Sequence, residues 1–186
     1  MSAIQALDER ILWWIAEHLR VGWLNGPVVL FSKLGNAGLL FILATLVLLV
    51  FKRTRRLGIH TAAGLIIDVL AVNVTIKPLV SRARPWLVME GFQTLARSSD
   101  PNSFPSGHTC AAFAFAAAIW VATPNKKIRA AALIVAALMG LSRLYVGVHF
   151  PSDVLAGVVI GSLCGLLGGL LARQGLTRWE RRKAEG

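Results

Sequence analysis

The sequence predicts an all-α fold, a polytopic membrane helical bundle of five transmembrane helices plus an N-terminal amphipathic interfacial helix. Hydrophobic residues make up 55% of the 186 residues, and the mean hydropathy of +0.63 is too high for an ordinary soluble domain. Five apolar stretches approach the ~20 residues that a helix needs to cross about 30 Å of hydrocarbon. Most basic residues lie in the short connections between these stretches. A single membrane-embedded domain, residues 1–186, follows from these observations.

The interfacial segment covers residues 1–26. From residue 4 to residue 20, apolar residues recur at helical spacing and charged residues occupy the other faces. This pattern is typical of a helix that lies in the plane of the membrane surface. Gly26 and Pro27 are expected to separate it from a short helix that leads into the first span. Asp8, Glu9 and Arg10 interrupt the apolar run, so a cleavable signal sequence is not predicted.

The transmembrane core covers residues 35–172, and a basic tail, residues 173–186, follows it. Spans are expected at residues 35–52, 58–77, 106–123, 128–146 and 153–172. With five spans, three basic clusters fall on one side, which the positive-inside rule makes cytoplasmic. The clusters are Lys52, Arg53, Arg55 and Arg56; Lys126, Lys127 and Arg129; and Arg173, Arg178, Arg181, Arg182 and Lys183. The tail is therefore predicted to be cytoplasmic, and the opposite span ends to face the cell exterior or periplasm.

Three features bear on the partners of the chain. The net charge of +11 does not indicate nucleic-acid binding, because the cations lie in loops between membrane spans. Cys110 and Cys164 lie within apolar stretches and lack metal-ligand spacing, which predicts core residues rather than a disulfide. The last span carries a glycine at every fourth position, which allows another helix to approach closely. Packing inside one subunit is favoured over a contact between two subunits, and a homodimer is the alternative. These glycines are Gly157, Gly161, Gly165 and Gly169.

Three polar motifs fall at the outward ends of the spans. They begin with Lys77 and Arg84, continue with Pro-Ser-Gly-His108, and end with Arg143 followed by His149 and Asp153. Transfer of a phosphoryl group needs cations on its oxygens, a nucleophile and a proton donor. Arginine offers the two-pronged contact that suits phosphate. Alone, Lys77 and Arg84 would be interpreted as snorkelling residues, but their coincidence with the other motifs favours an anion site.

The second motif predicts an anion-binding helix start. Ser106 is a plausible N-cap, so free backbone N–H groups and the helix dipole would point at an anion. Gly107 lets the backbone approach closely, and His108 in the first turn can donate a proton.

The third motif pairs a histidine with a carboxylate. Pro151 should end the preceding helix, and Asp153 can then accept the Nδ1 proton of His149, which raises the nucleophilicity of Nε2. The alternative is an N-cap carboxylate without a catalytic role. A metal site would also use two histidines and a carboxylate, but the surrounding cations would repel a divalent ion, so neither a metal nor another cofactor is predicted.

Together the motifs resemble those of the type 2 phosphatidic acid phosphatase superfamily, membrane lipid phosphatases related to vanadium-dependent haloperoxidases. The family pattern is Lys, six residues, Arg-Pro; then Pro-Ser-Gly-His; then Ser-Arg, five residues, His, three residues, Asp. The positions that match it without departure are Lys77 to Pro85, Pro105 to His108 and Ser142 to Asp153. The resemblance implies that His149 attacks phosphorus and forms a phosphohistidine, that Asp153 orients it, and that His108 protonates the leaving group and then activates water. It also implies metal-free catalysis and phosphate binding by Lys77, Arg84, Ser106, Gly107 and Arg143.

The substrate expected from this placement is a lipid phosphate or pyrophosphate whose tail lies in the bilayer. An outward-facing site suits undecaprenyl pyrophosphate in a bacterial envelope, and phosphatidylglycerophosphate or phosphatidic acid is the alternative. A non-enzymatic lipid-binding or transport protein is the remote alternative, and the spans exclude a soluble haloperoxidase. Asp68 and Asn73 lie inside the second span, where an interhelical hydrogen bond is favoured over a functional role. Arg82, outside the strict motif, is a candidate contact for the lipid head group.

Overall fold

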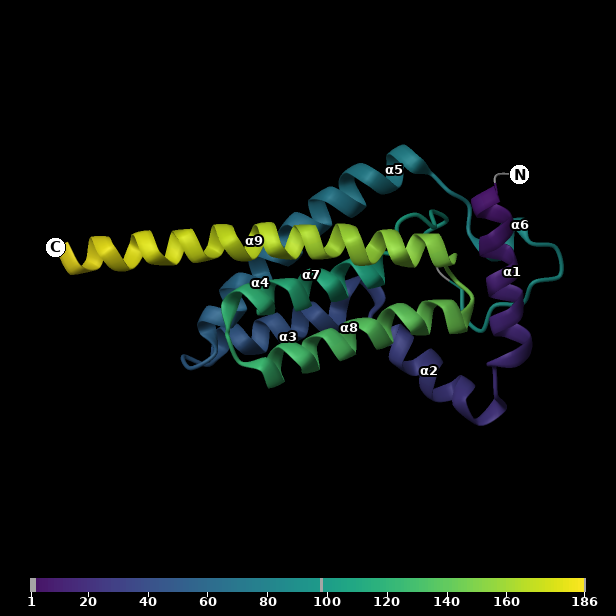
Figure 1. The fold of residues 1–186 in the computed structure, drawn as a ribbon, viewed down its shortest axis with the longest axis horizontal. Helices are drawn as coiled ribbons and strands as arrows, with labels where there is room; N and C mark the ends of the chain where they lie inside the picture. The colour runs from purple at the N-terminus through teal and green to yellow at the C-terminus, as the bar shows by residue number, and fades with distance from the viewer. Residues whose placement is uncertain (1–2, 98, 186) are drawn as a thin grey trace.

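The computed structural model describes residues 3–97 and 99–185, which fold into a bundle of helices (Figure 1). The predicted all-helical fold is confirmed. The elements are α1 (Ala3–His18), α2 (Gly22–Leu34), the 3-10 helix η1 (Asn36–Gly38), α3 (Leu39–Val50), α4 (Arg55–Asp68), the π-helix η2 (Val69–Ile76), α5 (Lys77–Val80), α6 (Pro85–Val88), α7 (Gly107–Ala122), α8 (Lys126–Val146) and α9 (Pro151–Glu185).

Helix α7 lies at the centre of the bundle and packs against α4, α8 and α9. Small residues make this close approach feasible: eight residues of α7 are buried, and five of those are alanines. The glycine ridge of α9 faces α7. A Cβ added at Gly161 would lie 2.8 Å from the Cα of Cys110, and one at Gly165 would lie 2.8 Å from the Cα of Ala114. The ridge therefore packs inside the subunit, as the favoured interpretation predicted.

Three helical stretches are long and apolar enough to cross a membrane. They are Arg55–Val80, which comprises α4, η2 and α5, then α8, and then α9. Helix α2 and the η1–α3 segment meet at a bend of 51° and make a fourth span if they cross together. The expected span at residues 106–123 corresponds to α7, whose 16 residues measure roughly 24 Å, less than the hydrocarbon thickness. Helix length therefore supports three or four of the five predicted spans.

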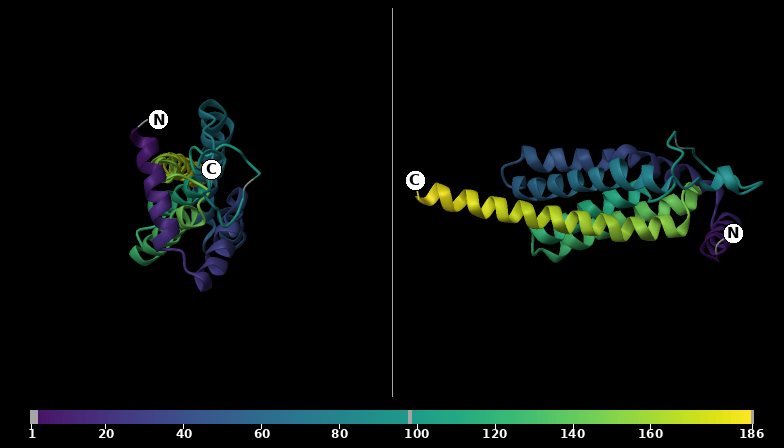
Figure 2. Two further views of the ribbon diagram at one scale, coloured as in Figure 1. Left: turned by 90° about the vertical axis from the view of Figure 1, so that its right-hand side faces the viewer. Right: turned by 90° about the horizontal axis from the view of Figure 1, so that it is seen from above.

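The N-terminal helix α1 lies across the end of the bundle where α9 begins (Figures 1 and 2). Its orientation fits an interfacial helix, but its C-terminal boundary differs from the prediction. The chain breaks after His18 rather than at Gly26, and Pro27 lies inside α2. Proline is tolerated there because the one carbonyl that it leaves unpaired belongs to Trp23, which is 78% exposed near the helix start.

The two ends of the bundle differ in charge. The turn between α3 and α4 and the connection between α7 and α8 lie at the same end as the C-terminus, whereas α7 and α9 begin at the other end, next to α1 (Figure 1). The three basic clusters therefore lie together, away from the three polar motifs, as predicted. The basic tail is helical, because α9 continues without a break to Glu185.

Candidate active site

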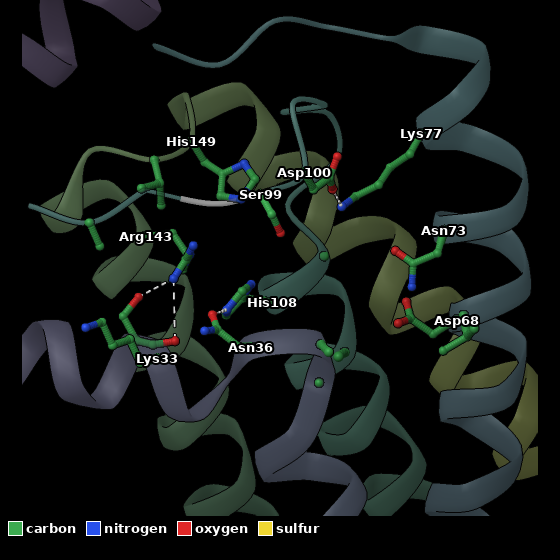
Figure 3. Close-up of a pocket in the computed structure, with 18 of the residues that line it drawn as sticks. Lys33, Asn36, Asp68, Asn73, Lys77, Ser99, Asp100, His108, Arg143 and His149 are labelled. Atoms are coloured by element: carbon green, nitrogen blue, oxygen red, sulfur yellow. Dashed lines mark hydrogen bonds and ion pairs between the residues drawn. The ribbon is translucent and has the colours of Figure 1, made fainter. Parts of the chain in front are cut away.

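A cavity of about 630 Å³ opens among α3, α4, α7 and α8 at the end of the bundle near α1 (Figure 3). Six of the eight predicted site residues line it: Lys77, Arg84, Gly107, His108, Arg143 and His149. Residues up to 72 positions apart in the sequence thus contribute to one hollow. Ser106 and Asp153 do not belong to the lining and are both 0% exposed, which places them in the wall behind it.

His149 lies in the turn between α8 and α9 and is 1% exposed. Gly147, with φ of 81°, ends α8 in a left-handed conformation that glycine adopts without strain, and this turn directs the following residues back toward the bundle. The Nδ1 atom of His149 lies 2.8 Å from the carbonyl oxygen of Ser103, and its Nε2 atom lies 3.1 Å from Arg84 Nη1. A carbonyl only accepts and a guanidinium only donates, so Nδ1 carries the proton and Nε2 presents a lone pair.

The predicted contact between His149 and Asp153 is different in the structure. The distance from Nδ1 to Asp153 Oδ2 is 3.7 Å, which is an electrostatic contact rather than a hydrogen bond. The Ser103 carbonyl, rather than the Asp153 carboxylate, accepts the Nδ1 proton of His149. Burial lowers the pKa of His149 to about 3, and the charges of Arg84 and Arg143 act in the same direction while Asp153 opposes them. His149 is therefore neutral at physiological pH, and a neutral imidazole can act as a nucleophile.

Asp153 lies in the first turn of α9, and its carboxylate accepts hydrogen bonds from three donors. Arg82 Nη1 donates to Oδ1 at 2.6 Å, the Phe150 amide donates to Oδ2 at 2.9 Å, and the Ser103 hydroxyl also donates to Oδ2. The carboxylate consequently stays beside the imidazole of His149 without binding it. It can stabilise the positive charge that appears on the ring when Nε2 forms a new bond.

Lys77 and Arg84 converge on a carboxylate that the sequence motifs do not include. Asp100, in the loop before α7, accepts a hydrogen bond from Lys77 Nζ and lies 3.6 Å from Arg84 Nη2. Burial opposes ionisation of Asp100, but the hydrogen bonds from Lys77 and the Asn102 amide outweigh it and hold the pKa of this carboxyl below its ordinary value. The two cations thus form an anion site that a phosphate would have to share with Asp100 or take from it.

Arg143 projects into the cavity from the last turn of α8. Its Nη1 atom donates to the Ser32 hydroxyl of α2, which fixes the side chain. Its Nε atom is buried and has no hydrogen-bond partner among the described residues. A buried donor without a partner is costly, so this N–H is well suited to a phosphoryl oxygen. Lys33 of α2 also belongs to the lining, outside the motifs, with its side chain extending away from Arg143 (Figure 3).

His108 occupies the first turn of α7, as predicted. Its Nε2 atom lies 3.1 Å from Asn36 Oδ1 of η1, an oxygen that only accepts, so Nε2 donates. Gly35 permits this approach, since a Cβ there would lie 2.8 Å from His108 Cδ2. The imidazole is therefore held by a neighbouring helix while its ring faces the cavity (Figure 3).

Ser106 occupies the N-cap position of α7 but makes no side-chain capping bond. Its hydroxyl accepts from Thr109 Oγ1 at 2.9 Å, and its amide donates to the Asp153 carbonyl at 3.1 Å. That amide is consequently not free for an anion. Gly107 does reach the cavity, where a Cβ would lie 3.5 Å from Lys77 Nζ, so this glycine keeps the space beside the ammonium group open.

Several residues of the cavity escaped sequence reasoning. Asp100 lies in an irregular loop where no periodicity marks it, and Asn36 lies in a short 3-10 helix. Ser103, which lies in the same loop, does not line the cavity but contacts His149 and Asp153 behind it. Asp68 was expected to bond another helix, yet it lines the cavity, and its Oδ1 atom has no hydrogen-bond partner among the described residues. Within residues 3–97 and 99–185, no three His, Cys, Asp or Glu side chains are grouped to hold a metal ion.

Comparisons with known proteins agree with the motifs. The PAP2 superfamily model matches residues 56–175. An undecaprenyl-diphosphatase from Sulfolobus acidocaldarius is 33% identical over 84% of this chain and 74% of its own length. The undecaprenyl-diphosphatase BcrC of Bacillus subtilis is 37% identical over 59% of this chain, which spans about half (53%) of that relative. The crystal structure of a transmembrane PAP2 type phosphatidylglycerolphosphate phosphatase from Bacillus subtilis superposes with a TM-score of 0.75, at 28% identity, over 94% of this chain and 88% of that one.

Proposed function

Because this chain belongs to the PAP2 superfamily of membrane lipid phosphatases, we propose that it hydrolyses undecaprenyl pyrophosphate through a phosphohistidine formed on His149. One observation carries the proposal. A neutral His149, with its lone pair on Nε2, faces a cavity that Lys77, Arg84 and Arg143 also line. A nucleophile and three cations around one hollow are what phosphoryl transfer needs.

In the first step, the terminal phosphate displaces Asp100 from Lys77 and Arg84. Arg84 Nη1 then donates to a phosphoryl oxygen instead of His149 Nε2, which frees the Nε2 lone pair. Nε2 attacks phosphorus, and the bond from phosphorus to the leaving oxygen breaks. The negative charge of the substrate favours the imidazolium form of His108, which gives its proton to the leaving oxygen. Asp153, 3.7 Å away, stabilises the positive ring of phosphohistidine.

In the second step, His108 acts as a base, since it has lost its proton to the leaving group. It takes a proton from a water molecule, whose oxygen attacks phosphorus on the side opposite His149. The bond from phosphorus to Nε2 breaks, and inorganic phosphate leaves. The same two histidines are thus restored without a metal, because the three cations supply the charge that a metal would otherwise supply.

Pyrophosphate is preferred over a monoester for two reasons. The two relatives named undecaprenyl-diphosphatase support it, and Lys33 contributes a fourth basic residue to the lining of the cavity. A second phosphate would place its charge near this additional ammonium group. Phosphatidylglycerophosphate is the second candidate, supported by the likeness to the Bacillus phosphatase structure.

The proposed membrane arrangement has five crossings, with α2 and α3 together as the first and the short α7 as the third. Because α7 packs against α4, α8 and α9, it can be shorter than the hydrocarbon layer is thick. The basic clusters favour a cytoplasmic C-terminus in a bacterial cell, and the cavity would then face the exterior or periplasm. The lipid tail would lie in the bilayer beside the bundle.

The test is phosphate release by the purified protein in detergent, with undecaprenyl pyrophosphate, phosphatidylglycerophosphate and phosphatidic acid compared side by side. We expect the pyrophosphate to give the highest kcat/KM and His149→Ala to abolish release. Lys33→Met should lower kcat/KM for the pyrophosphate more than for the two monoesters, with the exposed Lys52→Met as a matched control at the other end of the bundle. Undiminished turnover by His149→Ala would refute the mechanism, and a higher kcat/KM on a monoester would refute the substrate. Loss of release in the presence of a chelator would refute the metal-free reaction.

A further inference from the structure

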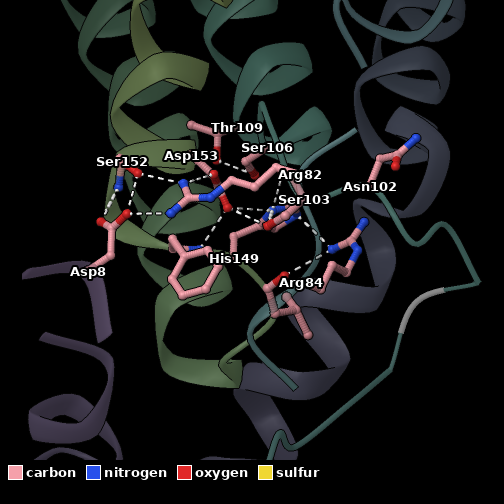
Figure 4. A network of polar contacts seen from close by, with 12 residues as sticks. Asp8, Arg82, Arg84, Asn102, Ser103, Ser106, Thr109, His149, Ser152 and Asp153 are labelled. Atoms are coloured by element: carbon pink, nitrogen blue, oxygen red, sulfur yellow. Dashed lines mark hydrogen bonds and ion pairs between the residues drawn. The ribbon is translucent and has the colours of Figure 1, made fainter. Parts of the chain in front are cut away.

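We propose that Arg82 and Asp8 are positioning residues that hold the Asp153 carboxylate for catalysis, so that the N-terminal helix α1 is part of the catalytic assembly. This inference rests on the proposed function, because it assigns a role in the step that forms phosphohistidine. It differs from the expectation that Arg82 contacts the lipid head group. Arg82 does not line the cavity, and its guanidinium points toward α1 and the start of α9 (Figure 4).

The Arg82 guanidinium bridges α1 and α9. Nη1 donates to Asp153 Oδ1 at 2.6 Å and to the Ser152 hydroxyl at 2.7 Å. Nη2 donates to Asp8 Oδ2 at 2.8 Å and to Gln5 Oε1 at 2.6 Å. The guanidinium carbon also lies 4.2 Å from the centre of the Phe150 ring. A planar group with this many partners has little freedom to reach a substrate, but it is well placed to fix a carboxylate.

Asp8 holds the other side of the network. It is 3% exposed, although an amphipathic surface helix normally turns its acidic residues to water. Its Oδ1 atom accepts from the Ser152 amide at 2.9 Å, and its Oδ2 atom accepts from both Arg82 and the Ser152 hydroxyl. A buried carboxylate is tolerated only with such compensation. The burial of Asp8 therefore indicates that α1 is docked on the catalytic turn through specific polar contacts.

The two oxygens of Asp153 have separate partners as a result. Arg82 holds Oδ1, which leaves Oδ2 turned toward Ser103 and His149. Without Arg82, the buried carboxylate could rotate away and would lose its charged partner. His149 would then lack a well-placed counter-charge at the moment its ring becomes positive. Because Arg82 does not touch the cavity, this loss should slow chemistry without weakening substrate binding.

The experiment compares Arg82→Met, Arg82→Lys, Asp8→Asn and the Arg82→Met/Asp8→Asn double variant in the phosphate-release assay. Arg82→Met should lower kcat on the order of 10- to 100-fold, the scale that a small misplacement of a catalytic group produces. KM and the inhibition constant for inorganic phosphate should stay within about threefold. Arg82→Lys should recover part of kcat, Asp8→Asn should lose less than Arg82→Met, and the double variant should be no worse than Arg82→Met. Arg10→Met and Glu17→Gln, exposed charges on α1, are controls that should leave kcat unchanged.

The outcomes separate this inference from the proposed function. If wild-type protein releases no phosphate from any of the lipids, the proposed function fails and the inference falls with it. If wild type is active and His149→Ala is inactive, the function stands, and full kcat in Arg82→Met overturns the inference alone. A rise in KM with unchanged kcat would assign Arg82 to substrate binding and also overturn it. If Arg82→Met fails to fold, as judged by thermal unfolding in detergent, Asp8→Asn and Arg82→Lys carry the test, and unchanged kcat in both overturns it.

Discussion

The contact between α7 and α9 can be tested with a single methyl group at Gly161. A Cβ at this position would lie 2.8 Å from the Cα of Cys110 and nearer still to its carbonyl oxygen, whereas ordinary contacts begin near 3.4 Å. Backbone atoms cannot move aside as a flexible side chain can, so the two helices would have to separate by at least about half an ångström. Overpacking of this kind costs about 1–3 kcal/mol.

The assay for Gly161→Ala is thermal unfolding in detergent, together with phosphate release. For a chain of this length, the expected destabilisation lowers the unfolding temperature by roughly 2–12 °C. Activity should fall as well, because α7 carries His108 and α9 carries Asp153. The matched control is Gly175→Ala in the same helix, where a Cβ meets nothing within 4 Å and the change should be neutral or stabilising by up to ~1 kcal/mol. Wild-type unfolding of Gly161→Ala, or an equal drop in both variants, would refute the reasoning.

Three further predictions concern the cavity. Asp100→Asn should bind phosphate more tightly, by about 2- to 5-fold in the inhibition constant of inorganic phosphate, because the competing carboxylate no longer pairs with Lys77; an unchanged or weaker constant would contradict this. Burial lowers the pKa of His149 to about 3, whereas the unfolded chain keeps the ordinary histidine pKa. As the pH falls, the unfolded chain therefore binds a proton that the folded chain does not bind, and the free energy of unfolding decreases below the ordinary histidine pKa. Between pH 7 and pH 5, the wild type should lose about 2 kcal/mol more than His149→Gln in parallel unfolding curves, and parallel losses would be inconsistent with a buried neutral imidazole. Asn36→Leu removes the acceptor that orients His108 and should lower kcat roughly 10-fold with little change in KM, measured on the preferred lipid; full kcat would rule out this orienting role.

The sequence was most informative where residue type alone determines chemistry. Lys77, Arg84, Arg143 and both motif histidines were identified from the pattern of cations and histidines at span ends, and the structure brings all five to one cavity. The apolar lengths also located α4, α8 and α9, because a membrane-crossing helix must satisfy its own backbone in lipid.

The remaining features depend on contacts between distant segments. Ser103 binds His149 through a backbone carbonyl, a group that every residue has, so no side-chain pattern could reveal it. Asp100 lies in a loop whose path is set by tertiary packing rather than by periodicity. The docking of Asp8 likewise depends on Arg82, 74 residues away, and an acidic residue on an amphipathic helix is ordinarily a solvated one. The boundary of α1 was misplaced because Pro27 was interpreted as a helix breaker, although proline is tolerated near a helix start.

Because α9 is a single unbroken helix, its length relates the depth of the site in the membrane to the position of the basic tail. Arg173 follows Pro151 by 22 residues, which is roughly 33 Å along a straight helix and close to the thickness of the hydrocarbon layer. If the basic residues from Arg173 onward mark one surface of the bilayer, the start of α9 is held at the opposite surface, and His149 with it. The proposed reaction would then be confined to a single leaflet, and a lipid whose phosphate is made in the other leaflet would have to be translocated before this site could act on it.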